Sequence, residues 1–246
     1  MNVIGIIPAR YASSRFPGKP LVDIGGKTMI QRVYEQAAKT PSLTKVIVAT
    51  DDDRIFNHVK GFGGVAVMTQ SSHQSGTERC AEVAALYSQP NDIIINIQGD
   101  EPFIQPKQIE KVISILAQND ELNIATLAKR INNQQDLFTP NIVKVIFTPT
   151  QKAIYFSRQV IPYIRDVEPK EWLMQYDFYK HIGLYGYRSK TLIELAQLSL
   201  STLEQVERLE QLRWLENDYS IGIATTELET IGIDTPEDLE KVKELF

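Results

Sequence analysis

The sequence has only one cysteine, Cys80, so it cannot form an intrachain disulfide. It lacks any run near the roughly 18 apolar residues that a transmembrane helix needs, and its start lacks the charged and apolar regions of a secretory leader. The 26 Lys and Arg residues are dispersed and are outnumbered by 31 Asp and Glu residues, which argues against a polynucleotide-binding surface. We therefore expect a cytoplasmic protein with no nucleic acid as a partner and no integral membrane contact.

Short β-branched runs alternate with helical patterns in the N-terminal half of the chain. The runs predict strands at residues 3–7, 45–49, 65–68 and 93–97, and helices at residues 28–39, 52–60, 76–87 and 107–118. This alternation predicts an α/β fold of Rossmann-like type, in which helices flank a mostly parallel central sheet. Ligands of such sheets bind at the carboxyl ends of the strands. Cys80 lies inside a predicted helix and is expected to be a packing residue.

The pattern loosens after residue 120, where a second lobe is expected. It predicts strands at residues 124–129, 143–146, 153–157 and 182–188, and helices at residues 192–198 and 203–215. A strand at residues 221–224 and a helix opened by Thr235 and Pro236 bring the chain back to the sheet. We therefore expect one domain over residues 1–246, with a nucleotide-binding core at about 1–120 plus 218–246 and a lobe at about 121–217.

The helix predicted at residues 203–215 has an apolar stripe that should face inward. The stripe consists of Val206, Leu209, Leu212 and Leu215. Glu210 and Gln211 lie off this stripe, so they are available to a ligand.

The loop after the first strand, residues 8–20 (PARYASSRFPGKP), holds three cations, no acid and several small residues. Small side chains let backbone N–H groups approach phosphate oxygens, and Arg10, Arg15 and Lys19 can neutralise the charge of a departing pyrophosphate. The loop therefore suits a polyphosphate ligand. A solvated basic loop is the alternative that the residue types alone leave open.

Two acidic segments follow predicted strands. Asp100 comes directly after the strand at residues 93–97, where its carboxylate can bind Mg²⁺; a turn residue is the alternative. The triple acid at residues 51–53 contains a D-x-D pattern, but acids at this place favour a helix N-terminus, and we assign them to that role. Ser75 and Glu78 form a capping-box pattern at the start of the next helix.

Several motifs in one order give the chain a resemblance to a known family. They are the loop at residues 6–19, SGTER at 75–79, QGDEP at 98–102, YFSR at 155–158, HIGLYGY at 181–187, LEQLR at 209–213 and GIDTPEDL at 232–239. Together they make the chain similar, over nearly its whole length, to the 3-deoxy-manno-octulosonate (Kdo) cytidylyltransferases, or CMP-Kdo synthetases. The resemblance implies a nucleotide-diphospho-sugar transferase-like fold, a smaller acceptor-binding and dimerisation lobe, and a homodimer.

The resemblance also implies a role for individual residues. Those expected to bind the nucleotide CTP are Ala9, Arg10, Arg15, Lys19, Ser75, Gly76, Arg79 and Gln98. Those expected to line the Kdo site are Arg158, His181, Tyr185, Glu210 and Gln211. Asp100 and Asp234 would hold Mg²⁺, and Lys19, Arg10 and Asp100 would be catalytic. His58 and His73 receive no role.

The reaction implied is in-line attack of the Kdo 2-hydroxyl on the α-phosphorus of CTP, which releases pyrophosphate and forms CMP-Kdo. This product would activate Kdo for lipopolysaccharide synthesis. Whether Asp100 is a general base or only a ligand, and how many Mg²⁺ ions take part, stays open. The alternatives are an enzyme that uses 8-amino-Kdo or sialate, and a noncatalytic nucleotide-binding protein, which should have lost Lys19, Asp100 or Asp234.

Overall fold

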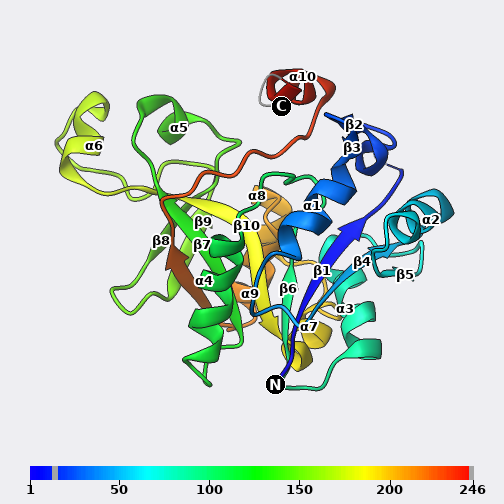
Figure 1. Ribbon diagram of the computed structural model, residues 1–246. Helices are drawn as coiled ribbons and strands as arrows, with labels where there is room; N and C mark the ends of the chain where they lie inside the picture. Colours follow the sequence, from blue (N-terminus) through cyan, green and yellow to red (C-terminus); the bar gives the residue numbers. More distant parts are fainter. Residues whose placement is uncertain (13–15, 244–246) are drawn as a thin grey trace.

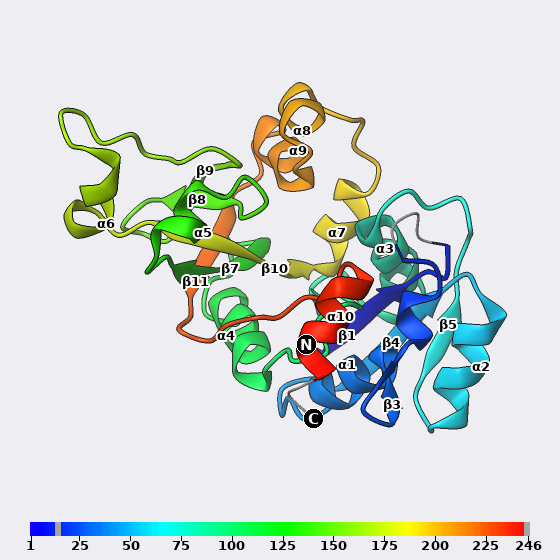
Figure 2. The same cartoon turned by 90° about the horizontal axis from the view of Figure 1, so that it is seen from above.

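A nine-stranded β-sheet forms the centre of the molecule in the computed structural model, which describes residues 1–12 and 16–243 (Figures 1 and 2). The strand order along its main path is β11-β7-β10-β6-β1-β4-β5, and β8 and β9 extend from β10. The strands are β1 (Val3–Ala9), β4 (Lys45–Thr50), β5 (Ala66–Met68), β6 (Ile93–Asn96), β7 (Ile124–Arg130), β8 (Lys144–Phe147), β9 (Ala153–Ser157), β10 (Tyr179–Arg188) and β11 (Ile221–Thr225). A separate hairpin pairs β2 (Asp23–Ile24) with β3 (Lys27–Thr28).

Most neighbouring strands of the main path run parallel. β1 is parallel to both β4 and β6, β4 is parallel to β5, and β11 is parallel to β7. β10 runs antiparallel between β6 and β7, and the β8–β9 pair continues this antiparallel part. The predicted α/β fold with a mostly parallel central sheet is confirmed.

Helices cover both faces of the sheet. The α-helices are α1 (Met29–Ala37), α2 (Asp53–Gly61), α3 (Gly76–Tyr87), α4 (Pro106–Ala117), α5 (Gln134–Phe138), α6 (Trp172–Gln175), α7 (Ser189–Leu195), α8 (Thr202–Glu207), α9 (Glu210–Glu216) and α10 (Pro236–Lys243), with 3-10 turns at Lys19–Leu21 and Pro169–Glu171. α1, α2 and α4 bury one face, where Ile7, Ile95 and Val112 are fully enclosed. α3, α7 and α9 bury the other face, which contains Cys80 and Trp214. Burial raises the pKa of the Cys80 thiol, which fits the packing role expected for it.

The elements of the first half lie within two residues of their predicted bounds, and α3 has the bounds predicted. Local chemistry sets several of these ends. Thr28 accepts a hydrogen bond from the Gln31 backbone N–H and so begins α1, and Asp52 does the same for Arg54 at the start of α2. The assignment of the triple acid to a helix start is confirmed for Asp52.

The helix predicted at residues 203–215 is wrong, because the structure divides it into α8 and α9. Arg208 lies between them in the left-handed conformation, with φ of 56°. The apolar stripe fails at the same place, since Val206 is 77% exposed while Leu209 and Leu212 are buried. A left-handed residue turns the chain and ends the 3.6-residue periodicity on which the prediction depended.

The lobe predicted at residues 121–217 overlaps the sheet. Its strands β7 and β10 lie on the main path of the central sheet, while β8 and β9, which continue the sheet from β10, lie with α5 and α6 at one side of the molecule (Figure 2). The sheet therefore has no boundary between the predicted core and the predicted lobe. That the two parts bind different substrates stays a prediction. Among the described residues, no helix has both the length and the apolar character that crossing a bilayer requires.

Candidate active site

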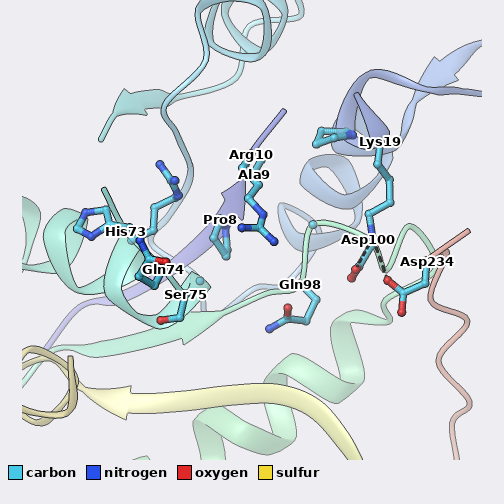
Figure 3. Close-up of a pocket in the computed structure, with 14 residues that line it drawn as sticks. Pro8, Ala9, Arg10, Lys19, His73, Gln74, Ser75, Gln98, Asp100 and Asp234 are labelled. Atoms are coloured by element: carbon cyan, nitrogen blue, oxygen red, sulfur yellow. Dashed lines mark hydrogen bonds and ion pairs between the residues drawn. The ribbon is translucent and has the colours of Figure 1, made fainter. Parts of the chain in front are cut away.

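The carboxyl ends of β1 and β6 open into a pocket of about 240 Å³ (Figure 3). Three segments form most of its wall: the loop after β1, the start of α3 and the loop after β6. The lining residues are Pro8, Ala9, Arg10, Lys19, Pro20, His73, Gln74, Ser75, Gly76, Arg79, Gln98, Gly99, Asp100 and Asp234. Every residue predicted to bind nucleotide lies here except Arg15, which is outside the described residues.

Lys19 lies between the two carboxylates that were predicted to hold a metal (Figure 3). Its Nζ donates to Asp100 Oδ2 at 2.7 Å and to Asp234 Oδ1 at 3.1 Å. Asp234 reaches this point because the Ile233 backbone N–H donates to the Asp100 carbonyl at 2.9 Å, and because Ile233 is buried against α10 and the β2–β3 hairpin. Distant parts of the chain thus place one cation against two acids.

Two glycines let the loops approach one another closely. A Cβ on Gly99 would lie 2.9 Å from the Pro8 carbonyl oxygen, so a side chain there would push β1 and the loop after β6 apart. A Cβ on Gly76 would lie 3.2 Å from the Pro8 ring. The first turn of α3 can therefore pack directly against the end of β1.

The N-terminus of α3 points its first turn at the pocket. Ser75 is the N-cap, and its hydroxyl accepts a hydrogen bond from the Glu78 backbone N–H at 3.1 Å. Helix N-termini carry unpaired N–H groups and a partial positive charge, which favour an anion. The exposed Arg10 side chain points into the same space from the end of β1 (Figure 3). This side of the pocket therefore suits phosphate groups.

Arg79 is almost fully buried at the back of the pocket, with 3% of its surface exposed. Its guanidinium pairs with Asp51 Oδ2 at 3.2 Å and donates to the Thr69 hydroxyl. Asp51 belongs to the triple acid that had been assigned to a helix start, so its ion pair with Arg79 was missed. A paired, buried guanidinium is held in one orientation, as recognition of a base edge requires.

Glu101 follows Asp100, and its carboxyl Oε2 atom is enclosed although the residue as a whole is partly exposed. Burial, with the nearby Asp100 charge as a second cause, raises the pKa of Glu101 to about 8. Its Oε2 atom has no hydrogen-bond partner among the described residues. Glu101 is therefore mainly protonated at neutral pH and adds little negative charge beside the pocket.

The residues expected to bind the acceptor do not line this pocket. His181 and Tyr185 lie on β10, and Gln98 of the pocket contacts this strand through its Nε2, which donates to the Gly183 carbonyl at 3.2 Å. The His181 ring is in hydrogen-bond contact with the Thr126 hydroxyl at 3.0 Å, and burial lowers the pKa of His181 to about 3. Burial also raises the pKa of Tyr185.

Glu210 links the start of α9 to the first turn of α3. Its carboxylate accepts from the Thr77 hydroxyl in the first turn of α3 and from Arg213 Nη2, both at 2.7 Å. Burial raises the pKa of Glu210. The neighbouring Gln211 is buried, with 6% of its surface exposed. Glu210 thus already has partners on two helices.

Arg158 has most of its contacts at the break between α8 and α9. Its Nε donates to the Glu207 carbonyl at 2.7 Å, Nη1 to the Pro140 carbonyl at 3.2 Å and Nη2 to the Arg208 carbonyl at 3.4 Å. The five predicted acceptor residues therefore lie just after β9, on β10 and on α9, outside the lining of the pocket.

Several lining residues were not singled out from the sequence. They are Pro8, Pro20, His73, Gln74 and Gly99. Pro8 and Gly99 lie inside segments that were predicted to bind ligand, so their position next to the named residues could have predicted that they line the pocket. His73 is in contact with Glu82 at 2.5 Å and lies 3.7 Å from Glu78, and no local pattern announced this.

The two acids at Lys19 fit a divalent cation by their chemistry. Mg²⁺ is commonly bound through one or two carboxylates, with water and phosphate oxygens as the other ligands. Asp100 and Asp234 already share one positive group, the Lys19 ammonium. No group of three or more His, Cys, Asp or Glu side chains suited to a metal occurs in the part of the chain that the structure describes.

Comparison with known proteins identifies the family. A model described as cytidylyltransferase matches residues 4–231. The 3-deoxy-manno-octulosonate cytidylyltransferase of Parabacteroides distasonis is 56% identical over 245 residues, which cover 98% of this chain and 96% of that protein. Its counterpart from Cytophaga hutchinsonii is 55% identical over 243 residues, with the same two shares.

Solved structures agree with the sequence relatives. A CMP:2-keto-3-deoxy-manno-octonic acid synthetase complexed with CTP aligns with a TM-score of 0.92 and 42% identity, and the match covers 100% of this chain and 98% of that one. A 4-diphosphocytidyl-2C-methyl-D-erythritol synthase, 12% identical with a TM-score of 0.65, shares the fold. The chain therefore belongs to the cytidylyltransferase family, and within it to the 3-deoxy-manno-octulosonate cytidylyltransferases.

Proposed function

We propose that this protein transfers CMP from CTP to the 2-hydroxyl of Kdo, giving CMP-Kdo and pyrophosphate, in the pocket at the carboxyl ends of β1 and β6. The observation that carries the proposal is the arrangement of Lys19 against Asp100 and Asp234 beside the first turn of α3. This arrangement places positive groups that suit a triphosphate next to two carboxylates that suit a metal. The names of the relatives supply the nucleotide and the acceptor.

The nucleotide half of the proposal depends on charge. The α3 N-terminus, Arg10 and Lys19 offer positive groups to the phosphates. Arg79, fixed by Asp51, and Gln98, fixed by the Gly183 carbonyl, would recognise the cytosine. In this arrangement Lys19 moves its ammonium from the carboxylates to the α-phosphate when CTP binds, and so stabilises the charge that develops as pyrophosphate leaves.

Magnesium is the cofactor that the acidic pair suits. Asp100 and Asp234 would hold Mg²⁺, which when bound would polarise a phosphate oxygen and lower the pKa of the attacking hydroxyl. The ammonium of Lys19 keeps the two carboxylates close together before a cation arrives, because their mutual repulsion is offset.

The acceptor half of the proposal depends on the contacts between β10, α9 and the nucleotide wall. Gln98 reaches the β10 backbone between His181 and Tyr185, and Glu210 contacts the first turn of α3. An acceptor bound against these residues would lie next to the α-phosphate. Arg158 would supply the cation for the sugar carboxylate through the guanidinium N–H groups that its backbone contacts leave over.

The setting that we propose for this activity is a cytoplasmic homodimer that activates Kdo for lipopolysaccharide synthesis. Large apolar side chains, including Ile154, Tyr163 and Met174, are 55–74% exposed around β9 and α6, which supports an interface there. Sedimentation velocity separates a dimer from the 27.9 kDa monomer.

The experiment that tests the function measures pyrophosphate release from CTP and Mg²⁺ with Kdo, with 8-amino-Kdo, with N-acetylneuraminate and with no acceptor. We expect pyrophosphate release when Kdo is the acceptor and no release in the other three reactions. Release with another acceptor in place of Kdo would contradict the acceptor half and leave the nucleotide half standing. Binding of CTP with no release for any acceptor would contradict the enzymatic function.

A further inference from the structure

Tyr11, the second residue of the loop after β1, is covered by a cation from a different element. The guanidinium carbon of Arg54, in the first turn of α2, lies 3.2 Å from the centroid of the Tyr11 ring. An arginine over a tyrosine face at this distance is a cation–aromatic stack. Neither residue lines the pocket, and the proposed reaction gives neither of them a role.

Asp52 fixes the arginine in this stack. Its Oδ1 accepts from Arg54 Nε at 2.9 Å, and its Oδ2 accepts from Nη2 at 2.7 Å. Two parallel hydrogen bonds hold the guanidinium plane more strictly than one contact would. The same pairing lowers the pKa of Asp52, so this carboxylate stays charged and keeps its hold on the arginine across neutral pH. Since Asp52 also caps α2, the helix start and the arginine are fixed together.

Tyr11 in turn closes the loop that carries the phosphate-binding cations. The Gly18 backbone N–H donates to the Tyr11 carbonyl at 2.9 Å. Gly18 has φ of 73°, and a Cβ there would lie 3.1 Å from the Tyr11 ring. Arg10 immediately precedes Tyr11 and Lys19 immediately follows Gly18. The stacked tyrosine therefore contacts Gly18 on the other side of the loop, and this contact lies next to both Arg10 and Lys19.

We propose that Tyr11, Arg54 and Asp52 form a loop anchor, in which the Asp52–Arg54 pair clamps the Tyr11 ring and thereby positions Arg10 and Lys19 for the triphosphate. The three are positioning residues, and the inference rests on the proposed function for the identity of the nucleotide. The anchor differs from a further phosphate ligand, because Nε and Nη2 of Arg54 already donate to Asp52 and its guanidinium carbon lies over the Tyr11 ring. It also gives Asp52 a role that a helix cap alone does not require.

Four variants of the full chain test the anchor: Tyr11→Leu, Arg54→Ala, the double variant, and Tyr11→Phe, which keeps the aromatic face. Lys60→Ala is the matched control, because Lys60 lies on the same helix with its Nζ 5.7 Å from the Phe56 ring. Calorimetry measures CTP affinity without turnover, initial rates give kcat and KM for CTP and Kdo, and urea unfolding reports stability.

We expect Tyr11→Leu and Arg54→Ala each to weaken CTP binding by roughly three- to tenfold, the range of one cation–aromatic contact. The double variant should be no weaker than the worse single variant, since both remove one contact. Tyr11→Phe should bind CTP like wild type, and KM for Kdo should stay unchanged in all four.

Three outcomes would overturn the anchor. They are CTP affinity in Arg54→Ala equal to that of Lys60→Ala, additive losses in the double variant, and a loss in Tyr11→Phe as large as that in Tyr11→Leu. A wild-type protein that binds CTP without turnover would contradict the proposed reaction, while the calorimetric comparison would still decide the anchor. A wild-type protein that does not bind CTP would overturn both.

Discussion

Lys19 is central to the proposed nucleotide site, because its Nζ contacts both Asp100 and Asp234, the two acids that would hold a metal. Removing its ammonium leaves charge on the departing pyrophosphate unbalanced and the two carboxylates repelling each other. We predict that Lys19→Ala lowers kcat for pyrophosphate release by about 10²–10³-fold and changes CTP affinity far less. Steady-state kinetics and calorimetry measure the two quantities.

Lys27→Ala is the control for this prediction. Lys27 is an exposed lysine of the same part of the chain, it pairs with Glu35, and it lies outside the pocket. If Lys19→Ala turns over as fast as Lys27→Ala, Lys19 has no part in the reaction.

His181 makes a prediction about pH and stability. Burial lowers its pKa to about 3, from the usual 6.5. Between these two values the unfolded chain binds a proton that the folded chain does not, so the free energy of unfolding falls as the pH is lowered from 6.5 towards 3. At pH 5 this contribution is roughly 1–2 kcal/mol smaller than at pH 8.

Urea unfolding of wild type, His181→Gln and His58→Gln at pH 8 and pH 5 tests this. The loss of stability on acidification should be smaller in His181→Gln by that amount. His58, a partly buried histidine in contact with the Thr28 hydroxyl, is the control. Equal losses in wild type and His181→Gln would show that His181 is protonated in the folded protein.

Two kinds of signal predicted single residues that line the pocket. Lys19 and Asp100 lie in loops that follow predicted strands, and their charges suit phosphate or a metal, whereas the expectation for Ser75 as a binding residue came from the family resemblance. The pair of Asp51 with Arg79 and the stack of Arg54 on Tyr11 could not be predicted, since they join side chains that no sequence period relates. The sequence shows that these residues are charged or aromatic, but it does not show which residues they contact.

At the scale of elements, one residue at the start of α3 both caps the helix and lines the pocket. This residue is Ser75. We predict that Ser75→Ala lowers the free energy of unfolding by about 1 kcal/mol, whereas Ser75→Asp keeps the cap and instead raises KM for CTP several-fold, because a carboxylate then faces the triphosphate.

The control cap is Asn133, which accepts from the Asp136 backbone N–H at 2.7 Å at the start of α5, outside the pocket. Asn133→Ala should lower stability and leave KM for CTP unchanged. The prediction fails if Ser75→Asp binds CTP as tightly as wild type, since the α3 terminus would then not face the phosphates.

The α8–α9 break shows what periodicity cannot determine. The apolar spacing of residues 203–215 favoured one helix, but Arg158, the residue after β9, donates to the Glu207 and Arg208 carbonyls and so stabilises the turn between two helices. Hydrogen bonds from another element can outweigh local helix propensity, which amounts to only a few tenths of a kcal/mol per residue. The β2–β3 hairpin and the short helices α5 and α6 were missed because each is too short to show a period.

At the scale of the whole molecule, the sheet brings together the two sets of residues that were predicted to bind substrates. β1 and β6 end at the pocket lined by the predicted nucleotide-binding residues, and β10, antiparallel beside β6, holds residues expected to contact the acceptor. The strand alternation predicted the place of the pocket, since parallel strands place their carboxyl ends on one edge. It did not predict that β7 and β10 share the sheet, because their pairing joins segments that are far apart in the sequence.

The most direct test of the proposed reaction is the ³¹P NMR spectrum of the purified protein with CTP and Kdo, recorded with Mg²⁺ and again after chelation of the metal. We predict that, with Mg²⁺, the CTP signals are replaced by pyrophosphate and one phosphodiester of CMP in equal amounts, and that chelation prevents this change. Pyrophosphate accompanied by free CMP, or CTP that remains intact with Mg²⁺ present, would contradict transfer of CMP to the sugar acid.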